Sequence, residues 1–380
     1  MRAREISNDR SICLSRRSPG PFRDQERTEY FASGREALRS LIDSVLPTGK
    51  MTVLLPDYVP EGVIRPFRTA AWEVLLYPID ENLDPLWQRL EALLKARKPA
   101  IAVLIHYFGL AKDAGRFRAL CNASGALMIE DLAHVLPGEG CEAGREGDYV
   151  LYSPTKTIGS PDGGILVRRH GAGMAFPKRK GSRAHTTYVV QQLLLLCVAT
   201  LGRRFTAGRW LRLLRRLSGR FLNSYETLSS YSHEPHQMSD IGRFLLRHAD
   251  WDGWARRRLD HASAYDRGLD GKIFKRVPGS FFPNGGPFGF PVMVDDRDDL
   301  QEHLAARGIR GLTLDGRWDF IPQEERQEHP GALAVLRKHF LFPTDQHLAD
   351  GQIQTVIAAA NDWAALRNRS QIAAPVAAVA

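Results

Sequence analysis

The sequence contains little cysteine and no cysteine pair spaced for a metal site. Its four cysteines, Cys13, Cys121, Cys141 and Cys197, show no CxxC spacing and have no accompanying pair of histidines. These spacings argue against both a zinc cage and a disulfide scaffold. We therefore predict that the protein holds no metal, and we expect a reducing compartment, the cytoplasm.

An apolar run long enough to cross a bilayer is also absent. The stretch YVVQQLLLLCVATLG (residues 188–202) is broken by two Gln and is shorter than the ~20 apolar residues that a spanning helix needs. Residues 1–29 lack the apolar centre of a secretory signal. We expect these 29 residues to form a poorly ordered, polar N-terminal leader.

Acidic residues are missing from one long segment, which changes the meaning of the net charge of +9. Residues 163–225 contain no Asp or Glu but thirteen Lys and Arg, so the rest of the chain has a net charge of −4. A protein that binds polyanions in general would spread its basic residues more widely. We therefore predict no nucleic-acid partner.

Within this segment, residues 209–221 have the pattern of a basic amphipathic helix. Apolar side chains recur at helical spacing, and arginines fill much of the opposite face. The apolar residues are Trp210, Leu213, Leu214, Leu217 and Phe221, and the arginines are Arg209, Arg212, Arg215, Arg216 and Arg220.

The remaining composition is that of a globular protein: 380 residues, 43% hydrophobic and 25% charged. Short apolar runs alternate with helical patterns between residues 50 and 170, which predicts an α/β fold with a mostly parallel central sheet. The runs are residues 51–55, 73–77, 100–107, 126–131, 148–153 and 163–167. A helical stretch at 113–125 closes with Gly125, a residue that suits a helix C-cap.

After about residue 240 the pattern changes to that of a smaller C-terminal α/β domain. We predict one long helix over residues 241–270, then a strand, a helix and a strand at 289–294, 298–309 and 310–314, and a last helix over 350–366. The predicted organisation is a polar leader (1–29), a large domain (30–173), a basic and apolar insertion (174–232) and a small domain (233–380).

Two motifs carry the strongest chemical signal, IEDLAHVLPG (129–138) and GDYVLYSPTKTIGSPDGG (147–164). Each begins at the end of a predicted strand, so Asp131 and the turn from Ser153 to Lys156 are expected to converge on one crevice. A lysine there can form a Schiff base with a cofactor aldehyde, and a carboxylate can keep a pyridine nitrogen protonated. This combination indicates pyridoxal phosphate chemistry.

A third motif, FASGREALRSLI (31–42), begins a helix whose free N–H groups could hold a phosphate. Each motif also has a purely structural explanation. Ser33 and Glu36 match a capping box, a strand-end Asp commonly caps a helix or turn, and a loop Lys is commonly a solvated charge. The order of the three motifs favours the cofactor site over these alternatives.

Taken in order, the segments SGREAL, LLPDYVPEGV, IHYFG, IEDLAH, GDYVLYSPTK, DGG, MSDIG and FPTDQHLADGQI resemble the DegT/DnrJ/StrS-type sugar aminotransferases. This family is a branch of the fold type I enzymes that depend on pyridoxal 5'-phosphate. The resemblance covers roughly residues 30–365. It implies a large domain that binds the cofactor, a smaller C-terminal α/β domain and a homodimer.

The resemblance also implies roles for particular residues. Lys156 is the Schiff-base lysine, and Asp131 is the partner of the pyridine nitrogen. Pro60 stands where many members have an aromatic residue that stacks on the cofactor ring, so Tyr58 is the candidate replacement. The other expected roles are Ala133 on a ring face, His134 near the phenolic oxygen, and Gly34, Arg35 and Ser153 at the phosphate.

The implied activity is transfer of an amino group from an amino acid donor to a keto sugar, probably a nucleotide-linked one. The alternative is a degenerate, non-catalytic protein that binds pyridoxal phosphate and uses its insertion to contact a membrane or a partner. Two departures motivate the alternative: Pro60 replaces the stacking aromatic, and Pro235 lies where the family usually has an Asn. The insertion could bind the inner face of a membrane peripherally, or it could equally pack in a domain or subunit interface.

Overall fold

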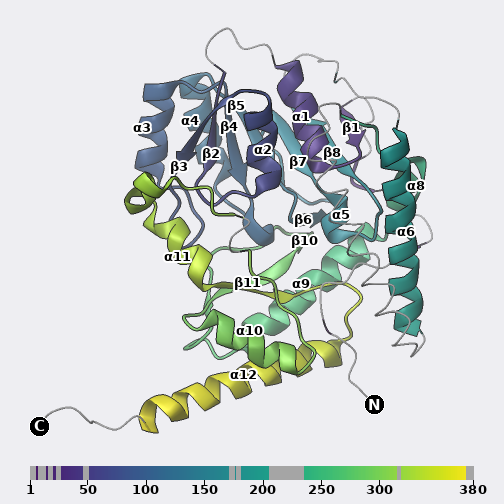
Figure 1. Ribbon diagram of the computed structural model, residues 1–380, viewed down its shortest axis with the longest axis vertical. Coiled ribbons are helices and arrows are strands. Elements are labelled where there is room, and N and C mark those ends of the chain that lie inside the picture. Colours follow the sequence, from purple (N-terminus) through teal and green to yellow (C-terminus); the bar gives the residue numbers. More distant parts are fainter. Residues whose placement is uncertain are drawn as a thin grey trace, which may run out of the picture.

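The computed structural model of the chain describes residues 6, 14–15, 20–22, 27–45, 51–170, 176, 181–204, 235–314 and 318–373 (Figure 1). Several sequence predictions lie outside these residues. The basic amphipathic helix predicted over residues 209–221 is one of them, and the rest of the insertion beyond residue 204 is another.

The described chain is built around a seven-stranded sheet. All strands run parallel except β8, which is antiparallel to both of its neighbours. The predicted α/β fold with a mostly parallel sheet is therefore confirmed. In sheet order the strands are β1 (Thr28–Phe31), β8 (Gly164–Arg168), β7 (Tyr149–Tyr152), β5 (Leu127–Asp131), β4 (Ile101–Ile105), β2 (Thr52–Pro56) and β3 (Glu73–Tyr77).

Helices between these strands cover the sheet, so that its central strands are buried on both faces. Every residue of β2 and β4 is buried, which explains why their sequences are continuous apolar runs without alternation. The helix predicted to close with Gly125 ends there in a left-handed C-cap with φ 78°. The helices are α1 (Gly34–Ser44), α2 (Glu61–Thr69), α3 (Trp87–Arg97), α4 (Ala114–Ser124) and the short α5 (Pro154–Thr157).

The C-terminal part forms a second apolar core below the large sheet (Figure 1). Its antiparallel strands are β12, β11 and β9, and β10 pairs separately with β6. The elements are β6 (Val135–Pro137), α8 (Asp240–Arg247), α9 (Trp251–Gly268), β9 (Lys275–Arg276), β10 (Gly285–Pro287), β11 (Gly289–Met293), α10 (Arg297–Ala306), α11 (Pro330–Lys338), β12 (His339–Pro343) and α12 (Asp350–Ala373). Two short 3-10 helices, η1 (Tyr107–Gly109) and η2 (Gln323–Glu328), complete the description.

Two predictions for the C-terminal part are wrong. The single helix predicted over residues 241–270 is broken into α8 and α9, because the Asp250 carboxylate accepts the N–H of Gly253 and starts a new helix. The strand predicted over 310–314 is only an isolated bridge between Leu312 and Leu341.

Some described residues of the N-terminal leader lie against the folded protein. Ile6 is buried and pairs with Ile309, and the ring of Phe22 packs edge-on against Tyr152 and Trp251. Burial of these two apolar side chains accounts for the contacts.

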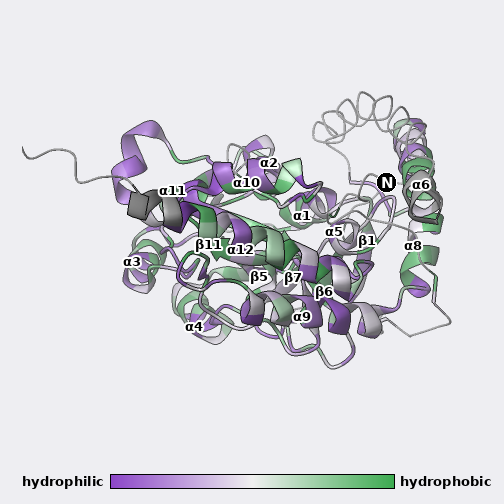
Figure 2. Ribbon diagram, turned by 90° about the horizontal axis from the view of Figure 1, so that it is seen from below, coloured by the Kyte–Doolittle hydropathy of each residue, from purple (hydrophilic) through white to green (hydrophobic). Residues whose placement is uncertain are grey.

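The described start of the insertion is helix α6 (Arg183–Arg204), which stands at the side of the molecule (Figures 1 and 2). One face of α6 turns inward, where His185, Val189 and Leu196 are buried, while Val190 and Leu194 are exposed. Among the described residues, no helix combines the length and the hydropathy that crossing a membrane would require.

Candidate active site

The candidate site forms where the carboxyl ends of β5 and β7 lie side by side. Asp131 is the last residue of β5, and β7 leads through Ser153 into α5, which carries Lys156. In open α/β sheets, ligands bind at this edge. The two motifs therefore converge as the sequence predicts.

Lys156 contacts His134 directly. The Lys156 Nζ lies 3.1 Å from the His134 Nε2, and His134 is 4% exposed. Burial lowers the pKa of the Lys156 amine, and the nearby Arg35 guanidinium lowers it further, while Asp131 opposes the shift. Burial and the charge of Lys156 also hold the pKa of the His134 ring well below its usual range. Both shifts favour neutral side chains.

The hydrogen bond at His134 Nδ1 indicates whether His134 Nε2 or Lys156 Nζ is the donor in this contact. The backbone N–H of Phe108 donates to His134 Nδ1 at 3.2 Å, so Nδ1 carries no proton. A neutral ring must then carry its proton on Nε2, and this N–H points at Lys156. This arrangement favours a neutral Lys156 amine, which would accept the Nε2–H through its lone pair, in the same direction as the lowered pKa.

Phe108 supplies that N–H from an unusual backbone conformation. Its φ is 58° and ψ is 6°, the left-handed region that a bulky residue rarely adopts. Its ring stacks on His134, with centroids 5.6 Å apart and planes 11° from parallel. The sequence suggested only that Phe108 packs against the sheet. The structure shows a second contact, through its backbone, with a candidate site residue.

Asp131 is buried, and its Oδ1 accepts the backbone N–H of Ala133 at 2.8 Å. Burial raises the pKa of its carboxyl, while the charge of Lys156 and the Ala133 N–H lower it. The structural alternative for Asp131, a strand-end turn former, is thus also present. Its electrostatic coupling to Lys156 is the additional feature that a turn former does not need.

The third motif lies against the second. A Cβ added to Gly34 would lie 3.9 Å from the Ser153 Cβ and 4.0 Å from its Oγ. The N-terminus of α1 and the residue that precedes α5 are therefore adjacent. The start of α1, with its N–H groups and positive dipole end next to the Ser153 side chain, suits an anion. The side chain of Arg35 runs past Gly62 at the start of α2.

The Ser33 half of the capping box predicted at the start of α1 is also present. The N–H of Glu36 donates to Ser33 Oγ at 3.2 Å, and the two side chains lie 3.4 Å apart. Glu36 in turn contacts His236, whose Nδ1 lies 3.1 Å from Glu36 Oε1. The cap occupies the side chains of Ser33 and Glu36, and it leaves the Gly34 side of the helix start facing Ser153.

Trp318, which the sequence did not single out, stacks on His134 together with Phe108 and Phe288. The ring centroids of Trp318 and His134 are 5.7 Å apart, with planes 16° from parallel. Tyr58 packs against Trp318 in turn, at 4.7 Å, and is fully buried. The structure thus gives Tyr58 a place in an aromatic cluster, and its proposed place on the cofactor ring stays a prediction. No pattern in the sequence marks Trp318.

His106, to which the sequence assigned no role, makes ordinary hydrogen bonds beside the site. Its Nε2 lies 3.0 Å from Glu130, and its Nδ1 accepts the N–H of Lys112 at 3.1 Å. It is buried and stabilises the loop after β4.

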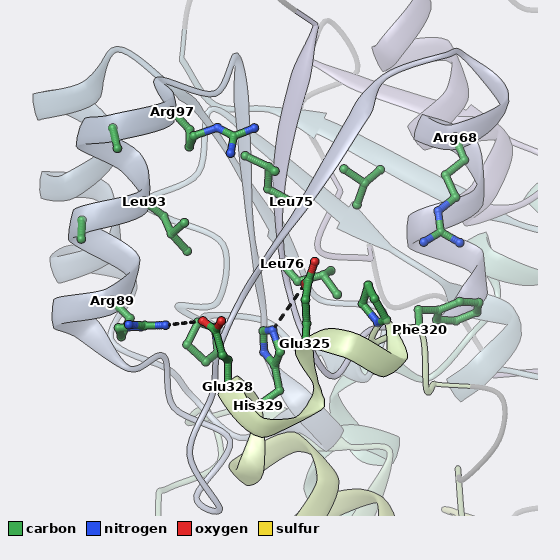
Figure 3. Close-up of a pocket in the computed structure, with 15 residues that line it drawn as sticks. Arg68, Leu75, Leu76, Arg89, Leu93, Arg97, Phe320, Glu325, Glu328 and His329 are labelled. Atoms are coloured by element: carbon green, nitrogen blue, oxygen red, sulfur yellow. Dashed lines mark hydrogen bonds and ion pairs between the residues drawn. The ribbon is translucent and has the colours of Figure 1, made fainter.

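A separate cavity of about 540 Å³ lies at the free edge of the large sheet, along β3 (Figure 3). Its polar groups pair largely with one another, as in the contact of Arg89 with Glu328 at 2.7 Å. The Arg68 guanidinium lies over the Phe320 ring at 5.7 Å. None of the predicted site residues lines this cavity.

Several solved structures with a similar fold carry titles that name aminotransferases. Streptomyces venezuelae DesV superposes with a TM-score of 0.61 at 21% identity over 89% of this chain and 84% of that one. Helicobacter pylori PseC gives a TM-score of 0.63 at 13% identity over 94% and 99%. The predicted fold class is therefore confirmed.

Residues 71–175 match the family model of the DegT/DnrJ/EryC1/StrS aminotransferases. A curated relative, dTDP-3-amino-3,4,6-trideoxy-alpha-D-glucose transaminase of Streptomyces venezuelae, is 27% identical over 78% of this chain and 72% of its own length. The erythromycin biosynthesis sensory transduction protein EryC1 of Saccharopolyspora erythraea is 24% identical over 62% of this chain and 55% of its own length.

These matches confirm the predicted resemblance to the DegT/DnrJ/EryC1/StrS aminotransferases. The predicted class of enzyme, a transaminase, is confirmed at this level. So is the predicted cofactor, because the family depends on pyridoxal phosphate.

Proposed function

We propose that the protein is a pyridoxal phosphate-dependent aminotransferase that moves an amino group from an amino acid to a keto sugar. The observation that carries this proposal is the position of the Lys156 Nζ, which lies 3.1 Å from His134 Nε2 and is electrostatically coupled to the buried Asp131 at the carboxyl edge of the sheet. Lys156 is the residue proposed to form the Schiff base with the cofactor aldehyde.

The residues of the site fit this cofactor. Asp131 is the carboxylate for the pyridine nitrogen, and the Nε2–H of His134 is a donor suited to a phenolate oxygen. Gly34 lies next to Ser153 and has no Cβ, so the start of α1 is open where a phosphate would approach. The Arg35 guanidinium adds a positive charge that is near enough to lower the pKa of Lys156.

When bound, pyridoxal phosphate supplies an electron sink for charge that develops next to the amino group. The chain supplies the proton transfer. A neutral Nζ can accept a proton from carbon and return it, and burial keeps its pKa nearer to working pH than that of a solvated lysine. The His134 N–H holds Nζ in place when it is not charged.

The sugar substrate is supported by the curated relative, whose printed name describes a transaminase of a dTDP-linked amino sugar. We extend to this chain the class of a nucleotide-linked keto sugar. The contacts around Lys156 do not by themselves select a sugar, so the substrate class depends on that relationship.

A degenerate protein that binds the cofactor without turnover is the second candidate. Trp318 packs against His134, and Tyr58 is engaged in the same cluster, so neither supplies a ring that is free for stacking. The relative EryC1, named as a sensory transduction protein, shows that the family name alone does not establish turnover.

Spectra of the full chain with pyridoxal phosphate separate the two candidates. An aminotransferase shows a Schiff-base absorbance at roughly 400 nm, and this band disappears when an effective amino donor such as glutamate is added. Lys156→Ala should lose the borohydride-reducible link, while Lys112→Ala should retain it. A band that no amino acid changes would favour the binding role.

We also propose that the chain forms a homodimer and acts in the cytoplasm, with its insertion in peripheral contact with a membrane. The resemblance to fold type I enzymes supports the dimer, since these enzymes generally build their sites between subunits. The basic and apolar sequence of residues 209–221 supports the membrane contact.

A further inference from the structure

A buried arginine of the small domain contacts the short helix that carries Lys156. Arg258 of α9 is 1% exposed, and its guanidinium makes four contacts. Its Nε donates to Gln346 Oε1 at 2.6 Å, its Nη1 to Pro287 O at 3.0 Å and its Nη2 to Thr157 O at 3.2 Å, and Nη2 lies 3.6 Å from the Asp345 carboxylate.

The contact with Thr157 reaches the backbone of the lysine helix. Thr157 directly follows Lys156 and is the last residue of α5, which has only four residues. Its carbonyl accepts a second hydrogen bond, from Gln346 Nε2 at 3.1 Å. A helix of one turn is not stable on its own, so the two donors from outside fix where α5 lies.

The contact with Pro287 reaches the segment that packs on His134, the residue that Lys156 contacts. The Pro287 carbonyl, which Thr344 Oγ1 also bonds at 3.0 Å, precedes Phe288. The N–H of Phe288 lies 3.0 Å from His134 O, and its ring stacks on the His134 ring at 4.9 Å. One guanidinium thus holds the segments that position both Lys156 and His134.

We propose that Arg258 is a positioning residue, which sets the contact between Lys156 Nζ and His134 Nε2 by holding the Thr157 and Pro287 carbonyls. This inference rests on the proposed function of Lys156. A buried guanidinium is costly unless every donor is satisfied, and an apolar side chain would often fill such a space with less penalty. Burial lowers the pKa of Arg258, whereas the Asp345 carboxylate raises it. A contribution to stability is therefore a weak explanation for a charged side chain at this position.

Arg257 provides a matched control on the same helix. Its side chain is 42% exposed, and it donates to Leu348 O at 2.8 Å and to Asp350 at 3.2 Å. It bonds neither Thr157 nor Pro287. Arg257→Gln therefore removes the same charge from α9 without touching the segments beside Lys156.

The test is competitive labelling of lysines in the purified full chain, with the cofactor removed, by a trace acylating reagent between pH 6 and 11. Mass spectrometry then gives the titration of each lysine. We expect Arg258→Gln and Arg258→Lys to raise the pKa of Lys156, because a displaced Nζ loses the His134 contact and gains water. Arg257→Gln should leave the Lys156 titration unchanged. The titration of Lys112, the control lysine, should be the same in every variant.

With cofactor bound, Arg258→Lys should lower kcat by about 10- to 100-fold with little change in KM. If Arg258→Gln does not fold, Gln346→Ala removes the second donor to Thr157 O and should shift Lys156 in the same direction. Variants that lose thermal stability but keep the Lys156 titration of the wild type would overturn the inference. Failure of the wild type to form a borohydride-reducible link through Lys156 would instead overturn the proposed function.

Discussion

At the scale of single residues, the chemistry of the site depends on where protons reside. The Phe108 N–H fixes the tautomer of His134, and His134 then favours a neutral Lys156. A substitution that preserves the packing but alters the protonation of one group should therefore lower turnover strongly. It should change the free energy of unfolding only slightly.

Asp131→Asn tests this expectation. The amide oxygen can still accept the Ala133 N–H, so the free energy of unfolding should change little. A neutral amide cannot stabilise a protonated pyridine nitrogen as a carboxylate does, so turnover should fall by on the order of 100-fold or more. Steady-state rates and denaturant unfolding measure the two effects. Activity within a few fold of the wild type would identify Asp131 as a turn former only.

The depressed pKa of Lys156 makes a prediction about stability and pH. The unfolded chain binds the lysine proton with an ordinary pKa of 10.5, and the folded chain binds it more weakly. Stability without cofactor therefore rises with pH between the lowered pKa and 10.5. Lys156→Met should stabilise this form at neutral pH, and the gain should fade as pH approaches 10.5.

Lys112→Met is the control for that measurement. Burial also lowers the pKa of Lys112, but its Nζ donates to Asn82 O at 2.8 Å and pairs with Asp84 at 3.1 Å. Its removal leaves these acceptors without the lysine and should destabilise the fold. Urea unfolding at several pH values compares the two variants. A loss of stability in Lys156→Met at neutral pH would contradict the buried, neutral amine.

At the scale of elements, the starts of two helices define the proposed phosphate site. Gly34 and Gly164 both lie close to the start of α1, but a side chain at each position would have a different effect. A Cβ on Gly34 has ordinary contacts with Ser153, whereas a Cβ on Gly164 would lie 2.2 Å from the Ser33 backbone. The first glycine leaves room for a ligand, and the second allows β8 to approach the start of α1.

Paired alanine substitutions separate these reasons. Gly34→Ala should fold with unchanged stability and lose roughly 10-fold in affinity for pyridoxal phosphate, because the methyl group narrows the space beside Ser153. Gly164→Ala should lose stability, by about 2 kcal/mol or more, since backbone atoms must move. Cofactor titration and thermal unfolding measure both variants. Equal cofactor affinity in Gly34→Ala and the wild type would exclude a phosphate at this turn.

Elements with a clear period were predictable from the sequence, and contacts between distant segments were not. The six apolar runs become β2, β3, β4, β5, β7 and β8, because a buried parallel sheet demands continuous apolar sequence. Asp131 and Lys156 were found because strand ends converge. Trp318 and Arg258 were missed, since their roles arise from packing of the small domain on the large one, which leaves no local pattern.

At the scale of the whole molecule, the dimer is the first proposal to test. Sedimentation of the full chain with cofactor should give a species of twice the 42.6 kDa chain mass at assay concentrations. Specific activity should fall on dilution into the range where the dimer dissociates, because a shared site is incomplete in one subunit. A stable monomer with full specific activity would exclude a shared site.

The insertion raises the remaining question at this scale, whether the whole enzyme attaches to a membrane. Its described helix, α6, is fastened to the body by a hydrogen bond between His185 and Asp162 at 3.0 Å, so attachment would bring the site close to the surface. The basic residues at 209–221 lie outside the described residues. Each could contribute about 1 kcal/mol near an anionic bilayer, and salt would weaken this attraction.

Flotation with liposomes that contain anionic lipid measures the attachment. The full chain should float at low salt and remain behind at high salt, and it should not float with neutral liposomes. A triple variant with Glu in place of Arg212, Arg215 and Arg216 should lose flotation while it keeps aminotransferase activity, because the site residues lie elsewhere in the chain. Arg257→Gln, which removes a charge from the small domain, is the control and should float like the wild type. If the full chain does not float even at low salt, the insertion packs in a domain or subunit interface, and its arginines serve that contact.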